Sequence, residues 1–130
     1  IDLDTVKPGL VHYDIGDCLR SCCNPVGEEV TDTTAVRFDL DLCEAVLEGY
    51  FAVAGGFLSD WDRHYVPDCI RLIPLELGMR FLTDHLEGNI YFQTTRPDHN
   101  LQRAAVQFRL TEEIERQMPE IRAMVRRLTA

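Results

Sequence analysis

The sequence predicts a mainly α-helical fold that has one short β segment at its N-terminus. Long segments carry apolar residues at spacings of three and four, the pattern of helices with one buried face. Apolar and acidic residues alternate in the opening Ile1-Asp2-Leu3-Asp4, and such alternation is typical of a strand. The chain of 130 residues is 45% hydrophobic, which is enough for a single core.

The N-terminal segment is expected to hold the strand and a first short helix. Residues 1–5 form the end of the strand, and a turn follows at Lys7-Pro8-Gly9. A helix is predicted from Tyr13 to about Cys22, with Asp14 as a candidate N-cap because its side chain can accept a hydrogen bond from the first turn. Residues 24–37 are polar and rich in turn-forming residues, so we expect a loop there.

A second helix is expected from about Asp39 to Ala54, where apolar residues recur on one face. Gly55-Gly56 ends it, because glycine suits the conformations that close a helix. Ser59, with Asp62 three residues later, resembles a capping box, in which each side chain bonds the backbone N–H of the other residue. This pair predicts a short helix around Trp61.

A long helix is predicted from about Asp68 to Leu86, stopped by Gly88. Residues 89–97 are expected to form an irregular connection. The last segment, residues 98–128, is expected to be helical with a break at Pro119, which suits the first turn of a new helix.

The charge balance argues against two classes of partner. The chain has 13 basic and 22 acidic residues, a formal net charge of −9. An acidic protein without a basic cluster is a poor ligand for the phosphates of nucleic acid or for anionic lipid. The uncharged stretch in the apolar middle runs from Gly49 to Ser59, far short of the ~20 apolar residues that a membrane-spanning helix needs. We therefore expect neither nucleic-acid nor membrane binding.

The cysteines are odd in number and lack the Cys-x-x-Cys spacing of zinc sites; they are Cys18, Cys22, Cys23, Cys43 and Cys69. Cys18 and Cys22 are four residues apart in a predicted helix. We expect them to be small buried apolar side chains rather than a zinc site or a disulfide framework. Reduced cysteines indicate a reducing, cytoplasmic compartment.

Asp2 and Asp4 are the first candidates for chemistry. Residues i and i+2 of a strand point to the same side, so both carboxylates face one space near the end of the predicted strand. Paired carboxylates suit a hard cation such as Mg²⁺, which takes one or two of them together with substrate phosphates. The alternative interpretation is an exposed edge strand or local capping of the turn.

The predicted long helix leaves one narrow polar stripe, formed by Glu76, Arg80, Asp84 and Glu87 at helical spacing. One interpretation is a solvated face with ion pairs between residues four apart. The other is a face toward a substrate pocket. There, two carboxylates would hold Arg80, and its planar guanidinium would donate hydrogen bonds to the oxygens of a sugar.

Three segments carry a resemblance to a known family. IDLDTVKPG, followed closely by YDIGD, resembles the C-terminal lobe of the aminoglycoside phosphotransferase and choline kinase-like enzymes, which are protein-kinase-like. ELGMRFLTDHLEGNIYF (residues 76–92) and RPDHNLQRA (residues 96–104) more narrowly resemble the N-acetylhexosamine 1-kinases. The resemblance covers nearly the whole chain in the same order and weakens in residues 24–37 and after Gln117. It implies the helical C-terminal lobe of a protein-kinase-like fold.

The resemblance also implies roles for the N-terminal carboxylates. Asp2 would bind the Mg²⁺ that bridges the phosphates of ATP, and Asp4 would support it or contact the metal or the sugar. Asp14 would be a buried carboxylate that orders the catalytic loop, although a plain helix N-cap explains this residue equally well. Phosphoryl transfer depends mainly on positioning and charge neutralisation, which agrees with these roles.

By the same resemblance, Arg80 and Tyr91 would line the sugar site. The whole enzyme would transfer the γ-phosphate of ATP to the anomeric hydroxyl of an N-acetylhexosamine. His99 and Asn100 belong to the third segment. We expect them to fix the start of the last helical segment by hydrogen bonds to the connection before it.

A kinase of this kind needs further parts. These are a strand-borne lysine, a flexible loop over the phosphates, and a catalytic loop with an Asp base and an Asn that binds Mg²⁺. Residues 1–130 show no catalytic-loop motif, so we expect them to be the C-terminal part of a longer enzyme, without kinase activity alone. Two alternatives stay open. The acceptor is an aminoglycoside, a choline-like alcohol or another sugar, or the chain is a non-catalytic acidic helical interaction module.

Overall fold

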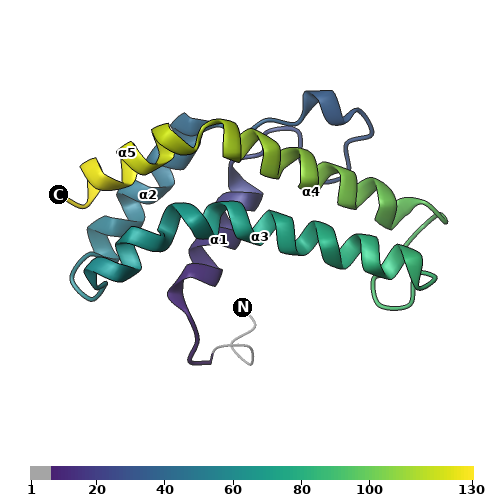
Figure 1. The fold of residues 1–130 in the computed structure, drawn as a ribbon, viewed down its shortest axis with the longest axis horizontal. Helices are drawn as coiled ribbons and strands as arrows, with labels where there is room; N and C mark the ends of the chain where they lie inside the picture. Colours follow the sequence, from purple (N-terminus) through teal and green to yellow (C-terminus); the bar gives the residue numbers. More distant parts are fainter. Residues whose placement is uncertain (1–6) are drawn as a thin grey trace.

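The computed structural model describes residues 7–130 as five α-helices and one 3₁₀ turn, with no strand in this range (Figure 1). The elements are α1 Val11–Cys22, η1 Thr33–Ala35, α2 Leu40–Ala54, α3 Asp60–Leu86, α4 His99–Arg116 and α5 Met118–Leu128. The mainly helical class is therefore confirmed. The predicted opening strand, with Asp2 and Asp4, lies outside the described residues. Across residues 7–130, no helix combines the length and the apolar character needed to cross a bilayer.

The longest helix, α3, organises the others. After the connection at residues 89–97, α4 returns antiparallel to α3, and α5 continues beyond it (Figure 1). α1 packs against α3, and α2 packs against α1 and α5. The fully buried side chains come from all five helices and include Leu19, Leu47, Ile70, Leu110, Ile114 and Ile121. One hydrophobic core therefore joins every helix.

α3 is one continuous helix, so the prediction of a short helix followed by a long one is wrong. It begins with the expected capping box: Ser59 Oγ accepts a hydrogen bond from the Asp62 N–H at 3.1 Å, and the Asp62 carboxylate accepts from the Ser59 N–H at 2.8 Å. Pro67 and Pro74 lie inside the helix, where a proline normally breaks or kinks it. Both are buried on the same face as Ile70, so ring burial against the core offsets the lost backbone hydrogen bonds.

The other helix ends agree with the sequence in part. α2 begins as predicted, because Asp39 Oδ1 accepts hydrogen bonds from two backbone N–H groups of the first turn at 3.0 and 3.1 Å. α1 begins earlier than predicted, at Val11, and Leu10 is its N-cap without a side-chain hydrogen bond. Asp14 is therefore not the N-cap. It is an acidic residue of the first turn, where the helix dipole favours a negative charge.

The loop before α2 is attached to the core. Val36 and Phe38 are buried, and the Asp39 N–H donates to the Cys23 carbonyl at 2.8 Å. Gln102 of α4 donates to the Val30 carbonyl at 2.9 Å. The segment predicted as a loop thus contains only the short turn η1, and it packs against α4.

Two glycines allow α3 to approach its neighbours closely. A Cβ atom built at Gly78 would lie 2.7 Å from the ring of Phe108 in α4. A Cβ atom built at Gly16 of α1 would lie 2.7 Å from the side chain of Ile73 in α3. Both distances are shorter than a carbon–carbon contact allows. The close packing of these helices therefore requires glycine, which has no side chain, at both positions.

We predict that Gly78→Ala lowers the free energy of unfolding by about 1–2 kcal/mol, because the added methyl group overpacks the contact with α4. Gly49→Ala in α2 is the matched control, since no atom lies within 4 Å of the added Cβ. Alanine favours a helix over glycine by about 1 kcal/mol, so the control should be at least as stable as the original chain. Unfolding in guanidinium chloride, followed by circular dichroism, measures both variants. Equal stability of the two variants would contradict the close approach.

Candidate functional site

A groove of about 590 Å³ lies between α3 and the connection at residues 89–97. This volume is within the range of small-molecule sites. The groove has an apolar part, a charged and polar part and two aromatic rings. The apolar residues are Leu72, Leu75 and Met79. The charged and polar residues are Glu76, Arg80, Thr83, Asp84 and Glu87, and the rings are those of Tyr91 and Phe92.

Arg80 and Tyr91, the residues expected to line a sugar site, lie side by side in this groove. Arg80 Cζ is 5.6 Å from the centroid of the Tyr91 ring and 5.5 Å from that of Phe92. The two rings meet edge to face with centroids 4.9 Å apart. The Arg80 side chain is 47% exposed and Tyr91 is 74% exposed. Both residues are therefore accessible to a ligand.

The guanidinium of Arg80 is held loosely. Its Nε atom is 3.8 Å from Glu76 Oε1, an ion pair that is too long for a hydrogen bond. Within residues 7–130 the guanidinium makes no hydrogen bond, so its N–H donors remain available to a ligand. The expectation that two carboxylates hold Arg80 is wrong, because Asp84 is engaged elsewhere.

Asp84 is buried, only 4% exposed, and so does not belong to a solvated polar stripe. Its Oδ1 atom accepts hydrogen bonds from the backbone N–H groups of Ile90 and Tyr91 at 3.0 and 2.8 Å. Its Oδ2 atom accepts from the Phe92 N–H at 3.0 Å and from Asn100 Nδ2 at 2.8 Å. One carboxylate therefore orders three consecutive residues of the connection and ties them to α4.

The pKa of Asp84 reflects these contacts. Burial disfavours the charged carboxylate and by itself raises the pKa. The hydrogen bonds from the backbone N–H groups of residues 90–92, together with that from Asn100, favour the charged form more strongly. The pKa of Asp84 consequently lies below its ordinary value of 3.8, and the residue is a carboxylate at neutral pH.

The chain reverses direction at the end of α3 through two residues in the left-handed region. Gly88 has a φ of +96° and Asn89 a φ of 61°, conformations that glycine and, less readily, asparagine tolerate. Asn89 Nδ2 donates to the Pro97 carbonyl at 3.1 Å, and its Oδ1 atom accepts from Asn100 at 3.1 Å. Asn89 thus joins the two ends of the connection.

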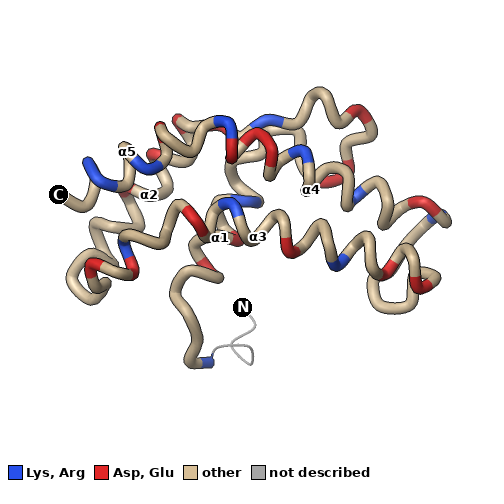
Figure 2. The backbone as a smooth tube through the Cα atoms, in the orientation of Figure 1, with Lys and Arg blue, Asp and Glu red and all other residues tan. Residues whose placement is uncertain are grey.

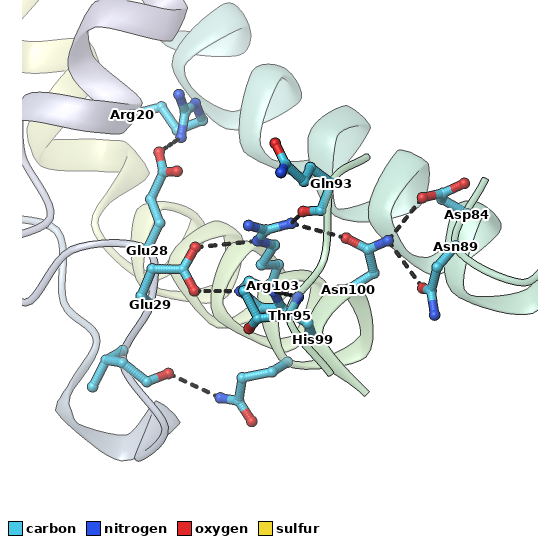
Figure 3. A network of polar contacts seen from close by, with 12 residues as sticks. Arg20, Glu28, Glu29, Asp84, Asn89, Gln93, Thr95, His99, Asn100 and Arg103 are labelled. Atoms are coloured by element: carbon cyan, nitrogen blue, oxygen red, sulfur yellow. Dashed lines mark hydrogen bonds and ion pairs between the residues drawn. The ribbon is translucent and has the colours of Figure 1, made fainter. Parts of the chain in front are cut away.

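Glu29, from the loop before η1, contacts two residues of α4 that hold the same connection (Figure 3). Its Oε2 atom is 2.6 Å from His99 Nε2, and its Oε1 atom accepts from Arg103 Nε at 3.1 Å. His99 Nδ1 accepts from the Thr95 N–H at 3.2 Å, so the proton of a neutral ring is on Nε2 and is donated to Glu29. Arg103 also donates to the Gln93 carbonyl at 3.0 Å. Two parts of the connection are therefore held from α4, and Glu29 orients both of the side chains that hold them.

The pKa of Glu29 is lowered, and the hydrogen bond with His99 is the largest cause. Partial burial opposes this shift, and Arg103 adds to it. The predicted role of His99 and Asn100, to fix the start of the last helical segment, is confirmed by their bonds to Thr95 and Asn89.

Sequence reasoning missed Asp84 and Glu29 as the residues that position the groove. A signal for Asp84 exists, because Pro74, Gly78 and Phe81 form a buried row at spacings of three and four that Asp84 continues. Glu29 has no comparable signal. It lies 70 residues from His99 in the sequence, and only the packing of its loop against α4 brings the two together.

The remaining predicted residues lie away from the groove. Asp14 is exposed on α1, so the expectation of a buried carboxylate is wrong, and the role expected for Asp14 toward a catalytic loop stays a prediction. Asp2 and Asp4 lie outside the described residues, and the magnesium site expected there stays a prediction. Within residues 7–130, no three His, Cys, Asp or Glu side chains come together as a metal site.

No protein-family model matches this chain. The kinase-like resemblance therefore rests on the three segments quoted above. A fold alone does not establish an activity, because function depends on the chemistry of specific sites such as this groove.

We predict that Asp84→Asn loosens the connection, because the amide keeps one acceptor oxygen for Ile90 and Tyr91, but its NH₂ group cannot accept from the Phe92 N–H or from Asn100. Protection against hydrogen exchange, measured by NMR, should fall most at the Phe92 amide and less at residues 90 and 91, while α1–α5 stay folded. The pKa of Asp84 is lowered in the folded state, so its contribution is complete above the ordinary value of 3.8 and is lost as the pH falls through the lower, folded value. Protection should therefore decline in this acid range in the original chain.

The variant should show no such decline, because it has no carboxylate to protonate. Glu87→Gln is the matched control, since Glu87 is an exposed acidic residue at the end of the same helix. Full protection of residues 90–92 in Asp84→Asn would refute the role assigned to this carboxylate.

Glu29→Gln and Glu28→Gln form a second matched pair of neighbouring substitutions. Glu29 bonds His99 and Arg103, whereas Glu28 pairs with Arg20 of α1 (Figure 3). We expect faster hydrogen exchange at the Thr95 amide in Glu29→Gln, because His99 loses its charged partner and orients less firmly. Glu28→Gln should leave this amide unchanged. An equal response of Thr95 to both substitutions would argue against a specific link through His99.

Proposed function

We propose that the groove beside Arg80 is the acceptor site of an ATP-dependent small-molecule phosphotransferase, and that the acceptor is an N-acetylhexosamine. In the whole enzyme, the anomeric hydroxyl of this sugar would receive the γ-phosphate. The observation that carries the proposal is the approach of Arg80 to the rings of Tyr91 and Phe92 within one groove. The segments that resemble the N-acetylhexosamine 1-kinases, residues 76–92 and 96–104, also build most of this groove and support it.

The groove offers two kinds of contact that a neutral sugar needs. The guanidinium of Arg80 is a planar donor for the ring oxygen, hydroxyls or amide carbonyl of the sugar. The exposed ring of Tyr91 offers an apolar surface with a polar tip, which suits the C–H face of a sugar and its hydroxyl edge. From Asp62 to Asp84, acidic and basic residues alternate along α3 (Figure 2).

The donor side of the reaction belongs to other residues. Asp2, with Asp4, would hold Mg²⁺ and the phosphates of ATP, together with a catalytic loop that this chain does not contain. We place the enzyme in the cytoplasm, where its five cysteines, all free in this structure, stay reduced. Residues 1–130 alone should bind the sugar without transferring phosphate.

Titration of the chain with N-acetylglucosamine and N-acetylgalactosamine, followed by NMR chemical shifts, tests this proposal. A sugar of roughly fifteen non-hydrogen atoms, at about −0.3 kcal/mol per atom, has a Kd on the order of 1 mM. Arg80→Ala should weaken binding about tenfold or more, because a hydrogen bond to a charged group contributes about 1.5–3 kcal/mol. In the full-length enzyme, the same substitution should raise the KM for the sugar.

Arg116→Ala is the control, because Arg116 is an exposed arginine of α4 that pairs with Glu113 and does not line the groove. Choline and an aminoglycoside complete the ligand panel. A stronger response to either of them identifies a cationic acceptor within the same superfamily. Absence of any shift at Arg80 and Tyr91 with all of these ligands would refute the acceptor site.

A second candidate function, a helical interaction module, is favoured by a different observation. Exposed apolar residues recur every seven positions along α3, at Tyr65, Leu72, Met79 and Leu86, and their exposed fractions range from 46% to 76%. A seven-residue apolar repeat is typical of a helix face that another helix covers. The two candidates are distinguishable, because a shift at Arg80 and Tyr91 on adding sugar supports the acceptor site and is not expected of an interaction module.

A further inference from the structure

Cys18 and Cys22 are exposed on α1, so the expectation that they are small buried side chains is wrong. Their Sγ atoms are 3.9 Å apart, because residues four apart lie above one another on a helix. The other cysteines differ in accessibility. Cys23 and Cys43 are buried, and Cys69 is intermediate. The structure describes all five cysteines, and among them only Cys18 and Cys22 are two neighbouring thiols that are exposed to solvent.

We propose that Cys18 and Cys22 form a dithiol site for a soft, thiophilic centre that bonds two sulfur atoms, as the trivalent arsenic of an arsenical does. A bridging atom suits the geometry better than a direct disulfide. The sulfur atoms of a disulfide are about 2.05 Å apart, whereas these are 3.9 Å apart on one turn of a regular helix. A single atom between them completes the link with little movement of the backbone.

The reaction is a condensation without change of oxidation state. With an aryl arsenic(III) oxide, the arsenic–oxygen double bond and two S–H bonds break, and two arsenic–sulfur bonds form. The oxygen leaves as water with both thiol protons. No oxidant or reductant takes part, so the site works in a reducing compartment, where both cysteines remain thiols.

The surroundings favour a ligand that takes both sulfurs over a reagent that attacks one. Burial, the hydrogen bond with Cys22 and the charge of Asp17 raise the pKa of Cys18. A thiol with a raised pKa reacts slowly with reagents that require a thiolate. Arg20, the nearest cation on α1, is committed to Asp17 and Glu28 and does not lower that pKa. A ligand that chelates both thiols is favoured instead, because the second bond forms within one complex.

The whole reduced chain, treated with phenylarsine oxide, tests the proposal. Mass spectrometry should show one adduct that survives excess glutathione, a monothiol, and that dithiothreitol, a dithiol, removes. The melting temperature should rise with the concentration of the probe, because the ligand binds the folded helix in preference to the unfolded chain. Cys18→Ser and Cys22→Ser should each lose the glutathione-resistant adduct, and the control Cys69→Ser should keep it.

Two results would overturn the proposal. A resistant adduct in both Cys18→Ser and Cys22→Ser would assign the arsenic to other thiols, such as the buried Cys23 and Cys43. Removal of the adduct from the original chain by glutathione would indicate a bond to a single thiol. Both serine variants replace an exposed side chain, and circular dichroism checks that they fold. The outcome is independent of the acceptor site in the groove.

Discussion

The buried carboxylate of Asp84 is the contact on which the groove depends. It accepts hydrogen bonds from three successive backbone N–H groups after α3 and from Asn100 at the start of α4. A connection between two antiparallel helices has few contacts of its own, so its conformation must be set by such bonds. Because the Tyr91 N–H is one of the donors, this carboxylate also sets where the Tyr91 ring lies relative to Arg80.

The continuity of α3 is the second constraint. The helix runs through Pro67 and Pro74, and both rings are buried. Local preference disfavours proline within a helix, but packing against the core overrides local preference when enough apolar surface is buried. The same helix approaches its neighbours closely at Gly78, and it carries the groove near its C-terminal end. A break at Pro67 would have separated the capping box from the rest of the helix.

The polar contacts around α4 link segments that are far apart in the chain. Glu29 orients His99 and Arg103, and these in turn hold the backbone at Thr95 and Gln93 (Figure 3). The groove therefore has support from two sides, from Asp84 near its aromatic rings and from Glu29 at the far end of the connection. A binding site on a loop gains precision when the residues that support it are themselves hydrogen-bonded, and this arrangement is consistent with the proposed acceptor site.

Much of the local structure could be predicted from the sequence, because caps and helix ends depend on neighbouring residues. The structure confirms the predicted start of α2 at Asp39, the capping box at Ser59 and Asp62, and the end of α3 just before Gly88. The proximity of Arg80 and Tyr91 was reached only through a resemblance. Periodicity placed Asp84 on a polar stripe, because a periodic pattern depends only on residue type. It carries no information on the backbone N–H groups of residues 90–92 that bond Asp84 in the folded chain.

The sequence by itself determined the helical class, most helix ends and the acidic balance of the chain. Only the tertiary structure decided that Asp84 points inward and that Cys18 and Cys22 point outward. The physical reason is that burial is a property of pairs of packed surfaces. Which face of α1 or α3 is covered depends on helices that are distant in the chain, and no local pattern specifies that choice.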